Sequence, residues 1–291
     1  MTILHDGVAT GYFGEQLTVP AANGARRAYN IPPGMSRLMI EPTAAMRFQW
    51  TPAIRAVWFY DASAPANARW KNLTRDVYSS YHAQRVPRLI NGARDASAAY
   101  PGHTQDILAS MTAQDFIYVG VVAPIGGLYI EVSGANDQNQ ALSVAHSSGG
   151  DVFASIASIT DGTDSTGTLA QDGAVTWTAP DRGSLWQARR LNDILRDPTM
   201  PRELNVYRLF WLRLSVAGTL AAATQLDYIA VLAVNAMGGV EGNEGGAILK
   251  ADVEYTADIE RWLPVPNNIG ALEVMAQADS ATTAQATWVK R

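Results

Sequence analysis

Residues that could carry out catalysis or bind a metal are few in this sequence and poorly spaced for either role. The four histidines, His5, His82, His103 and His146, show no metal-ligand spacing, and no HExxH motif occurs. The chain has no cysteine, which excludes disulfides, thiolate zinc sites and cysteine nucleophiles together. We therefore predict no catalytic residue, no metal site and no cofactor, and we expect that the protein is not an enzyme.

Two segments resemble ligand-binding loops but lack a necessary part of each. Asp161–Gly167 crowds oxygen ligands together as calcium loops do, yet it has neither the alternating acids nor the closing Glu of an EF-hand. A turn rich in Ser, Thr, Asp and Gly explains it better. No predicted helix follows the glycines of Gly238–Gly246, so a phosphate cradle is not expected there. A glycosidase-type carboxylate pair stays a minor alternative, because the separation of two acids exists only in the fold.

Aromatic residues are the feature best suited to binding a ligand. The chain has 8 tryptophans and 11 tyrosines, and rings exposed on a β-sheet can stack against sugars. In the first part of the chain, Trp58, Tyr60 and Trp70 are the candidates for a glycan-binding or interface surface. Packing in the core is the competing interpretation, and we expect it to hold for most of the aromatic residues.

Short runs of β-branched and aromatic residues predict an all-β protein. The 24 glycines and 14 prolines separate these runs, as turns separate strands. In Tyr207–Val216, every second residue from Phe210 to Val216 is apolar, so this face is predicted to point inward. The predicted strands are Arg37–Glu41, Met46–Trp50, Arg55–Tyr60, Phe116–Val122, Leu128–Ser133, Ala141–His146, Val152–Ile159, Ala174–Thr178, Tyr207–Val216 and Leu226–Val234.

Two stretches show helical spacing. Asn67–Tyr81 repeats large apolar residues every three or four positions, and Ser184–Arg196 has a serine suited to the N-cap and ends before Pro198. Each is short and lies between strands, which argues against a parallel α/β sheet. The predicted fold is an antiparallel β-sandwich, jelly-roll-like, with short helical insertions and a C-terminal extension.

The sequence divides into three predicted regions. Residues 1–110 form a β-rich region with one helix, residues 111–236 form the β-sandwich, and residues 237–291 form a C-terminal arm or strand extension. The arm follows a glycine-rich hinge that is flexible by composition. It could add a strand to a neighbouring subunit, and folding back onto its own domain is the equal alternative.

Charge is low throughout the chain. Charged residues make up 17% of the sequence and the net charge is −5, against about 25% charged residues in a typical protein. A neutral surface suits contact between subunits. The alternative is a neutral surface that contacts no partner. No block of Lys or Arg occurs, so nucleic acid is not an expected partner. The N-terminus does not read as a signal peptide and no apolar run is long enough to span a bilayer, so we expect cytoplasmic synthesis and no membrane partner.

Five residues in the middle of the chain have specific predicted roles. Asp172-Gly173 is typical of a hairpin turn, because glycine adopts positive φ without strain. Trp177 and Trp211 are predicted to fill or flank the sandwich core. Arg213 could stack on an aromatic ring, pair with a carboxylate or, as the simplest reading, stay solvated at the sheet edge.

The segment 115–232 resembles a known kind of domain. Asp115–Gly120 opens a strand, a later strand ends in Ile159–Thr163, and Thr168–Pro180 and Tyr207–Val216 follow. These features are similar to the β-sandwich domains of tailed-bacteriophage virion structural proteins of head-decoration, neck or tail-accessory type. In those domains a strand leads into a DGT turn, then an SxDGxxxWxxP hairpin, then a YWxRLxV strand. Ala170 stands where that pattern has Ser, and the insertion 183–206 is longer than the pattern.

The resemblance implies a structural component of a tailed-phage virion, made in the host cytoplasm. Such a component would mediate subunit assembly or decorate the particle through its β-sandwich and its terminal arm. Its expected partners are other virion proteins, namely capsid, neck or tail subunits, together with copies of itself in a homo-oligomer. The alternative is a glycan-binding module of a phage tail that serves host attachment.

Overall fold

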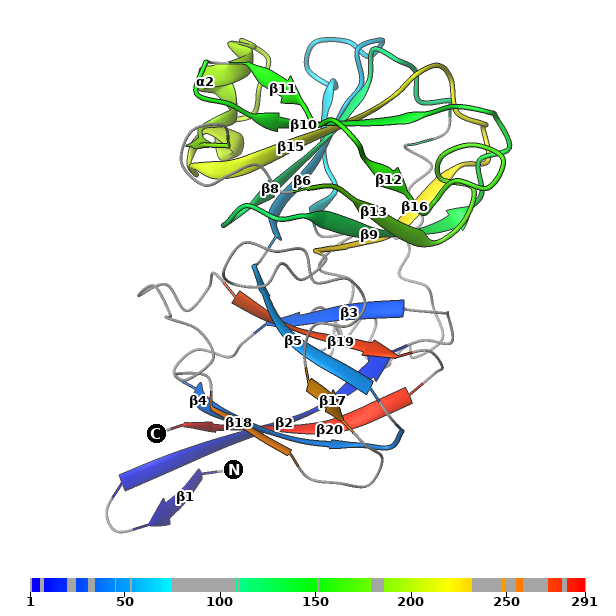
Figure 1. The fold of residues 1–291 in the computed structure, drawn as a ribbon. Coiled ribbons are helices and arrows are strands. Elements are labelled where there is room, and N and C mark those ends of the chain that lie inside the picture. The colour runs from blue at the N-terminus through cyan, green and yellow to red at the C-terminus, as the bar shows by residue number, and fades with distance from the viewer. Residues whose placement is uncertain are drawn as a thin grey trace, which may run out of the picture. The chain divides into compact units, whose positions relative to one another are not determined.

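The computed structural model of the chain describes residues 2–5, 8–19, 25–30, 35–44, 46–52, 54–74, 108, 110–150, 152–178, 186–231, 247–249, 255–258, 272–278 and 282–290. These residues lie mostly in antiparallel strands, so the predicted all-β class is confirmed. The chain forms two compact units (Figure 1). Unit 1 comprises Met1–Pro52 and Glu241–Arg291, and unit 2 comprises Ala53–Val240.

Unit 2 is a sandwich-like pair of antiparallel sheets. The larger sheet has the strand order β11-β10-β15-β8-β6-β7, with β14 paired to β15, and the smaller has the order β12-β13-β9-β16. The strands of the larger sheet are β6 (Ile54–Tyr60), β7 (Trp70–Asn72), β8 (Phe116–Val121), β10 (Leu142–Ser147), β11 (Phe153–Ser155), β14 (Ala188–Arg189) and β15 (Leu209–Val216). Those of the smaller sheet are β9 (Gly127–Gly134), β12 (Thr160–Asp161), β13 (Gly173–Thr176) and β16 (Gln225–Val231).

The main core of unit 2 lies between these two sheets. One face of β15 contributes Leu212, Leu214 and Val216, and the smaller sheet contributes residues such as Ile130 and Val175. The alternation of β15 therefore directs its apolar face inward as predicted. Trp177 also lies in this core, where its Nε1 donates a hydrogen bond to the carbonyl oxygen of Ile125 over 3.0 Å.

The opposite face of the larger sheet is covered by a second hydrophobic cluster. Two short helices, α2 (Leu191–Leu195) and η3 (Arg202–Asn205), contribute Leu191 and Leu204 to it. The helix predicted over Ser184–Arg196 is therefore much shorter, because Ala188–Arg189 pairs with β15 as a strand. In the other predicted helix, Asn67–Tyr81, Trp70–Asn72 forms β7 instead, and residues 75–81 lie outside the described part.

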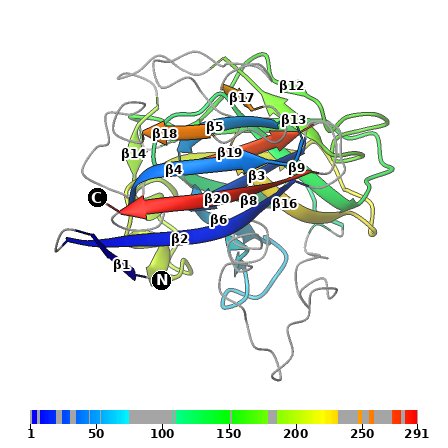
Figure 2. The ribbon, with the colours of Figure 1, turned by 90° about the horizontal axis from the view of Figure 1, so that it is seen from below.

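Unit 1 also contains two antiparallel sheets. Their orders are β1-β2-β20-β4-β18 and β17-β5-β19-β3, and β2 contacts both β3 and β19. Figure 2 shows the C-terminal strand β20 between the N-terminal strands β2 and β4. The strands are β1 (Thr2–His5), β2 (Val8–Val19), β3 (Ala25–Asn30), β4 (Met35–Pro42), β5 (Met46–Pro52), β17 (Ala247–Leu249), β18 (Tyr255–Asp258), β19 (Leu272–Ala278) and β20 (Thr282–Lys290).

The two units divide the chain differently from the three predicted regions. The predicted boundary at residue 110 falls inside unit 2, because β6 pairs with β8 across it. The segment 237–291 supplies strands that pair with N-terminal strands of the same chain, which is the fold-back alternative. The reason is non-local pairing: Thr43 and Thr283, for example, are joined by hydrogen bonds from the amide and hydroxyl of Thr43 to the carbonyl oxygen of Thr283, each 2.8 Å long.

The predicted hairpin turn at Asp172-Gly173 is wrong. Gly173 is the first residue of β13 and its φ lies outside the left-handed region. The connection from β12 to β13 runs from Gly162 to Asp172. A Cβ on Gly173 would overlap the carbonyl group of Gly162. Glycine is therefore needed here for close approach of two backbone segments rather than for a left-handed turn.

Among the described residues, no helix is both long and apolar enough to span a membrane.

Candidate functional site

Aromatic side chains gather on the outer face of the larger sheet, the face that is turned away from the main core. Trp70, Tyr60 and Phe116 occupy one cross-strand row, since Tyr60 is paired with Trp70 on β7 and with Phe116 on β8. Ring centroids are 5.0 Å apart for Tyr60 and Trp70 and 6.3 Å apart for Tyr60 and Phe116. Directly paired residues of antiparallel strands share a face, so this row is a continuous aromatic surface, here called the aromatic face.

A second row continues the aromatic face toward the middle of the sheet. Trp58 is paired with Tyr118, and Tyr118 is paired with Arg213 on β15. The ring of Tyr118 lies 5.4 Å from that of Trp70 and 5.6 Å from that of Phe153 on β11. Aromatic residues from four strands, β6, β7, β8 and β11, therefore meet on one side of the sheet.

Burial divides the aromatic face into a covered part and an accessible margin. Trp58, Tyr118 and Trp211 are buried, and they pack with Leu191 and Leu204 of the two short helices. Tyr60, Trp70, Phe116 and Phe153 are only partly buried. Of the three aromatic residues singled out from the sequence, Trp58 is thus a packing residue. Tyr60 and Trp70 lie in the accessible margin.

Arg213 is the charged group of the aromatic face. Its guanidinium carbon lies 4.8 Å from the ring centre of Phe116 and 5.1 Å from that of Phe153. Of the three alternatives left open by the sequence, Arg213 takes the first, stacking on aromatic rings. Its Nε is buried and has no hydrogen-bond partner among the described residues. The half-buried cation therefore lies between two rings with part of its hydrogen-bonding capacity unused.

Tyr118 stays a neutral phenol beside this cation. Burial raises the pKa of Tyr118 above its ordinary value of 10.0, although the nearby charge of Arg213 acts in the opposite direction. Because loss of the proton is disfavoured, Tyr118 offers a hydroxyl group and not a phenolate near the guanidinium. The charge of Arg213 is therefore not cancelled by its tyrosine neighbour at neutral pH.

Asp197 fixes one end of the aromatic face. Its Oδ2 accepts a hydrogen bond from Trp70 Nε1 over 3.1 Å, and its Oδ1 accepts bonds from the amide and hydroxyl of Thr199, each 2.7 Å long. Burial alone would raise the pKa of Asp197, but the bonds from Thr199 and Trp70 outweigh it and hold the pKa below 3.8. The loop between α2 and η3 is thereby tied to β7.

We expect Asp197→Asn to lower the free energy of unfolding by roughly 1–3 kcal/mol, because an amide NH₂ replaces one accepting oxygen and faces a donor. Urea unfolding near pH 7 measures this change. Asp193→Asn, on exposed α2 surface, is the matched control and should change stability by less than about 0.5 kcal/mol. In the native chain the contribution of Asp197 is present above pH 3.8 and falls as the pH drops below that value. Equal effects of the two substitutions would show that Asp197 does not anchor the loop.

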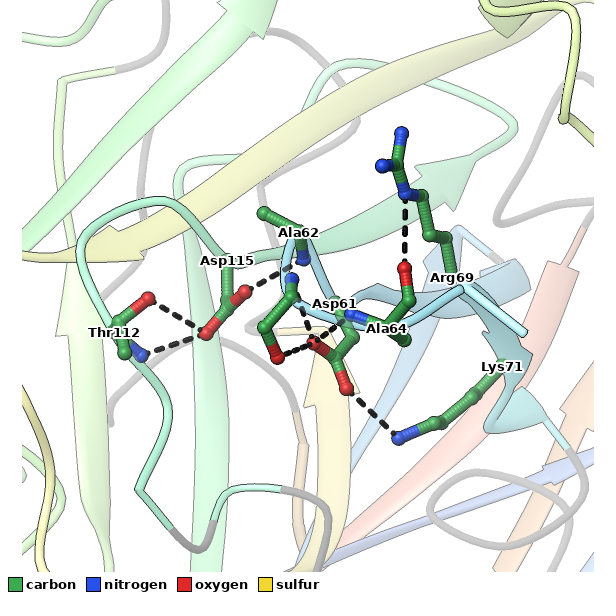
Figure 3. Close-up of polar contacts among 8 residues, drawn as sticks. Asp61, Ala62, Ala64, Arg69, Lys71, Thr112 and Asp115 are labelled. Carbon is green, nitrogen blue, oxygen red and sulfur yellow. Dashed lines mark hydrogen bonds and ion pairs between the residues drawn. The ribbon is translucent and has the colours of Figure 1, made fainter. Parts of the chain in front are cut away.

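A pair of carboxylates beside the aromatic face has a structural role (Figure 3). Asp61 accepts hydrogen bonds from Ser63, from the amide of Ala64 and from Lys71 Nζ, whose distance to Oδ2 is 3.2 Å. Asp115 is buried and accepts bonds from the amide of Ala62 and from Thr112, each 2.8 Å long. Both carboxylates hold the loop that joins β6 to β7, so their oxygens are occupied by backbone and side-chain donors.

The Asp161 loop is likewise a polar turn. Asp161 Oδ1 accepts hydrogen bonds from the amide and the hydroxyl of Thr163, and the amide of Leu169 donates to the Thr163 hydroxyl oxygen. Thr163 is fully buried, so the loop is closed around it as the turn interpretation predicts. Within the described ranges, no group of three or more His, Asp or Glu side chains could hold a metal ion.

The contribution of Phe116, Phe153 and Arg213 to a single site could not be recognised from the sequence. The sequence places Phe116 and Arg213 on strands, but their meeting depends on which strands pair and in which register. Phe153 lies on β11, which reaches this site only because β10 pairs with β15. Alternation identifies the face of one strand and not its neighbours.

The fold and this face define an all-β protein that presents a half-buried aromatic surface, with Arg213 within it and Asp197 at one end. When compared with known proteins, the sequence matches no family model and no curated protein.

Proposed function

We propose that the chain is a structural component of a tailed-phage virion that acts through contacts with neighbouring subunits. The observation that carries the proposal is the position of the resembling motifs: β8, β13 and β15, which contain them, lie in the two facing sheets of unit 2. The proposal places the protein in the virion after synthesis in the host cytoplasm. Its partners would be capsid, neck or tail subunits and further copies of the chain.

Exposed apolar side chains support contact with other proteins. Val206 and Tyr207 are 65% and 60% exposed, and Val152 is 54% exposed. Large apolar side chains of this kind are the usual centre of a protein interface, where burial releases water from apolar surface. Together with the low charge of the sequence, they favour assembly over catalysis as the role of this chain.

The proposal predicts that the chain is present in purified particles of the phage that encodes it. Mass spectrometry of density-purified particles should find peptides from both units in stoichiometric amounts. Removing residues 241–291 deletes β17 to β20, four of the nine strands described in unit 1. We expect such a chain to keep unit 2 folded and to be lost from particles. Its normal incorporation would show that unit 1 is not the assembly element, and absence of the full chain from particles would refute the virion proposal.

Glycan binding is the second candidate function, and the aromatic face favours it. Sugar rings present apolar C–H faces that pack on aromatic rings, while their hydroxyls need polar neighbours. Tyr60 and Trp70 supply partly exposed rings, and Arg213 supplies a donor-rich group within the same surface. A virion component with such a surface could attach the particle to a host glycan.

The glycan proposal predicts that Tyr60→Ala and Trp70→Ala each weaken binding to any glycan found on an array by about tenfold, as stacking contacts of 1–2 kcal/mol are lost. Tyr207→Ala is the control, because it removes an exposed tyrosine between η3 and β15 that makes no contact with the rings of the aromatic face among the described residues. Thermal unfolding of each variant checks that the fold is kept. Binding that is equally sensitive to Tyr207→Ala would place the glycan elsewhere.

A further inference from the structure

Small hydroxyl residues share the sheet face of Arg213. Ser215 lies two residues along β15 and is paired with Ser143 on β10, and Arg213 itself is paired with Ala145, whose partner on β11 is Ser155. These positions share the face of Arg213 because side chains alternate along a strand and paired residues point the same way. Three serines therefore lie on the same sheet face as Arg213, on β15 and the two strands beyond it.

The serines are accessible and available. Ser143 and Ser155 are exposed and Ser215 is half-buried, and none of the three hydroxyls has a hydrogen-bond partner among the described residues. Ala145, which is paired with Arg213, is buried and has only a methyl group as its side chain. The strands from β7 to β11, in the order β7-β6-β8-β15-β10-β11, together extend over about 24 Å at roughly 4.8 Å per step. This length suits a short oligosaccharide.

Charge decides which glycan fits. Arg213 makes no ion pair with a carboxylate in the described part of the chain, and its neighbour Tyr118 is a neutral phenol. A half-buried cation flanked by two rings and by hydroxyl groups is complementary to a planar anion, and the guanidinium fork matches the geometry of a carboxylate. The flanking rings hold the fork in place and exclude water from its faces, which strengthens such a pair.

We propose that the aromatic face binds a glycan that carries carboxylate groups, with a sugar carboxylate on Arg213, a pyranose ring on the margin formed by Tyr60, Trp70 and Phe116, and sugar hydroxyls on the serines. The inference rests on the second proposed function, glycan binding, and it adds the chemical class of the ligand. Neutral glycans lack the group that Arg213 requires. They would bind only through the rings and hydroxyls.

The test compares acidic oligosaccharides with their own carboxyl-reduced counterparts on the full-length protein. A panel of uronic-acid and sialic-acid oligosaccharides is titrated calorimetrically, each beside the same chain after reduction of its carboxylates to alcohols. We expect at least one acidic member to bind roughly tenfold to a hundredfold more tightly than its reduced form. Raising the salt concentration should weaken the acidic member more than the reduced one.

Variants of Arg213 assign the effect to this site. Arg213→Met keeps an unbranched stem between the rings and should reduce the acidic glycan to the affinity of its reduced form. Arg208→Gln removes an exposed arginine just before β15 and should change neither affinity. Thermal unfolding of each variant accompanies its titration. If Arg213→Met does not fold, Arg213→Lys takes its place, and the comparison of acidic with reduced glycans on the native chain decides the question.

The outcomes separate the two proposals. Equal affinity for acidic and reduced glycans, or acidic binding that survives loss of Arg213, overturns the carboxylate assignment and leaves glycan binding in place. Failure of every acidic and neutral glycan to bind overturns both. Neither result bears on the presence of the chain in virions.

Discussion

Replacing Trp211 with alanine lowers the free energy of unfolding by about 3–5 kcal/mol, the range expected for truncating a large buried aromatic side chain. Trp211 is 1% exposed and is among the largest fully buried side chains of the described residues. It packs against Leu209 and against the residues that the two short helices contribute. Its Nε1 also donates a hydrogen bond of 2.9 Å to the carbonyl oxygen of Arg189 in β14. Alanine would leave a cavity and remove this hydrogen-bond donor at once.

Two further variants separate these contributions in a urea titration. Trp211→Phe keeps most of the buried ring and loses the donor, so we expect a cost of roughly 1–3 kcal/mol. Tyr207→Ala truncates an aromatic residue that is 60% exposed and should cost less than about 0.5 kcal/mol. A Trp211→Ala cost below 1 kcal/mol would mean that the second cluster does not hold the helices to the sheet.

Replacing Gly173 with alanine should destabilise unit 2 by about 1–3 kcal/mol or more, because the added methyl group has no space. A Cβ on Gly173 overlaps the backbone of Gly162 and approaches the amide nitrogen of Thr163 to 2.8 Å. A side chain could rotate away, but these are backbone atoms of a turn that the hydrogen bonds between Asp161 and Thr163 hold in place. The strand β13 would have to move away from the turn.

Gly150→Ala is the matched control for this prediction. A Cβ at Gly150 meets its nearest neighbour, a methyl carbon of Val152, at 3.8 Å, which is an ordinary contact. We expect Gly150→Ala to be neutral or slightly stabilising, because alanine restricts the unfolded chain. Similar midpoints of thermal unfolding for the two variants would show that Gly173 is not required for close backbone approach.

The sequence predicts local features of this fold well. Alternation along Tyr207–Val216 identifies the inward face of β15, because only one of the two faces of that strand is apolar throughout. The composition of short aromatic and β-branched runs likewise predicts the all-β class. Both inferences depend on residues within one element, where side-chain type and direction are linked directly.

Features that depend on pairing between distant segments could not be predicted from the sequence. The spacing of Trp70 within Asn67–Tyr81 is helical, yet Trp70 pairs with Tyr60 in a sheet, where ring contacts and a bond to Asp197 outweigh local preference. Asp172-Gly173 has the composition of a turn, but glycine is required at 173 because the backbone of Gly162, eleven residues earlier in the turn after β12, lies against it. The aromatic face combines residues of β6, β7, β8, β11 and β15, whose order along the sheet no local pattern reveals.

The position of β20 between β2 and β4 has a consequence for how the polypeptide is made. On the ribosome, the N-terminal strands emerge first but lack their central neighbours until residues 272–290 have been synthesised. All described strands of the sandwich of residues 54–231 are synthesised before the C-terminal strands. The sandwich should therefore fold first, before β2 to β5 have their partners. Because contacts across more than 200 residues form slowly, completion of unit 1 is expected to be the last and slowest event in maturation of the nascent chain.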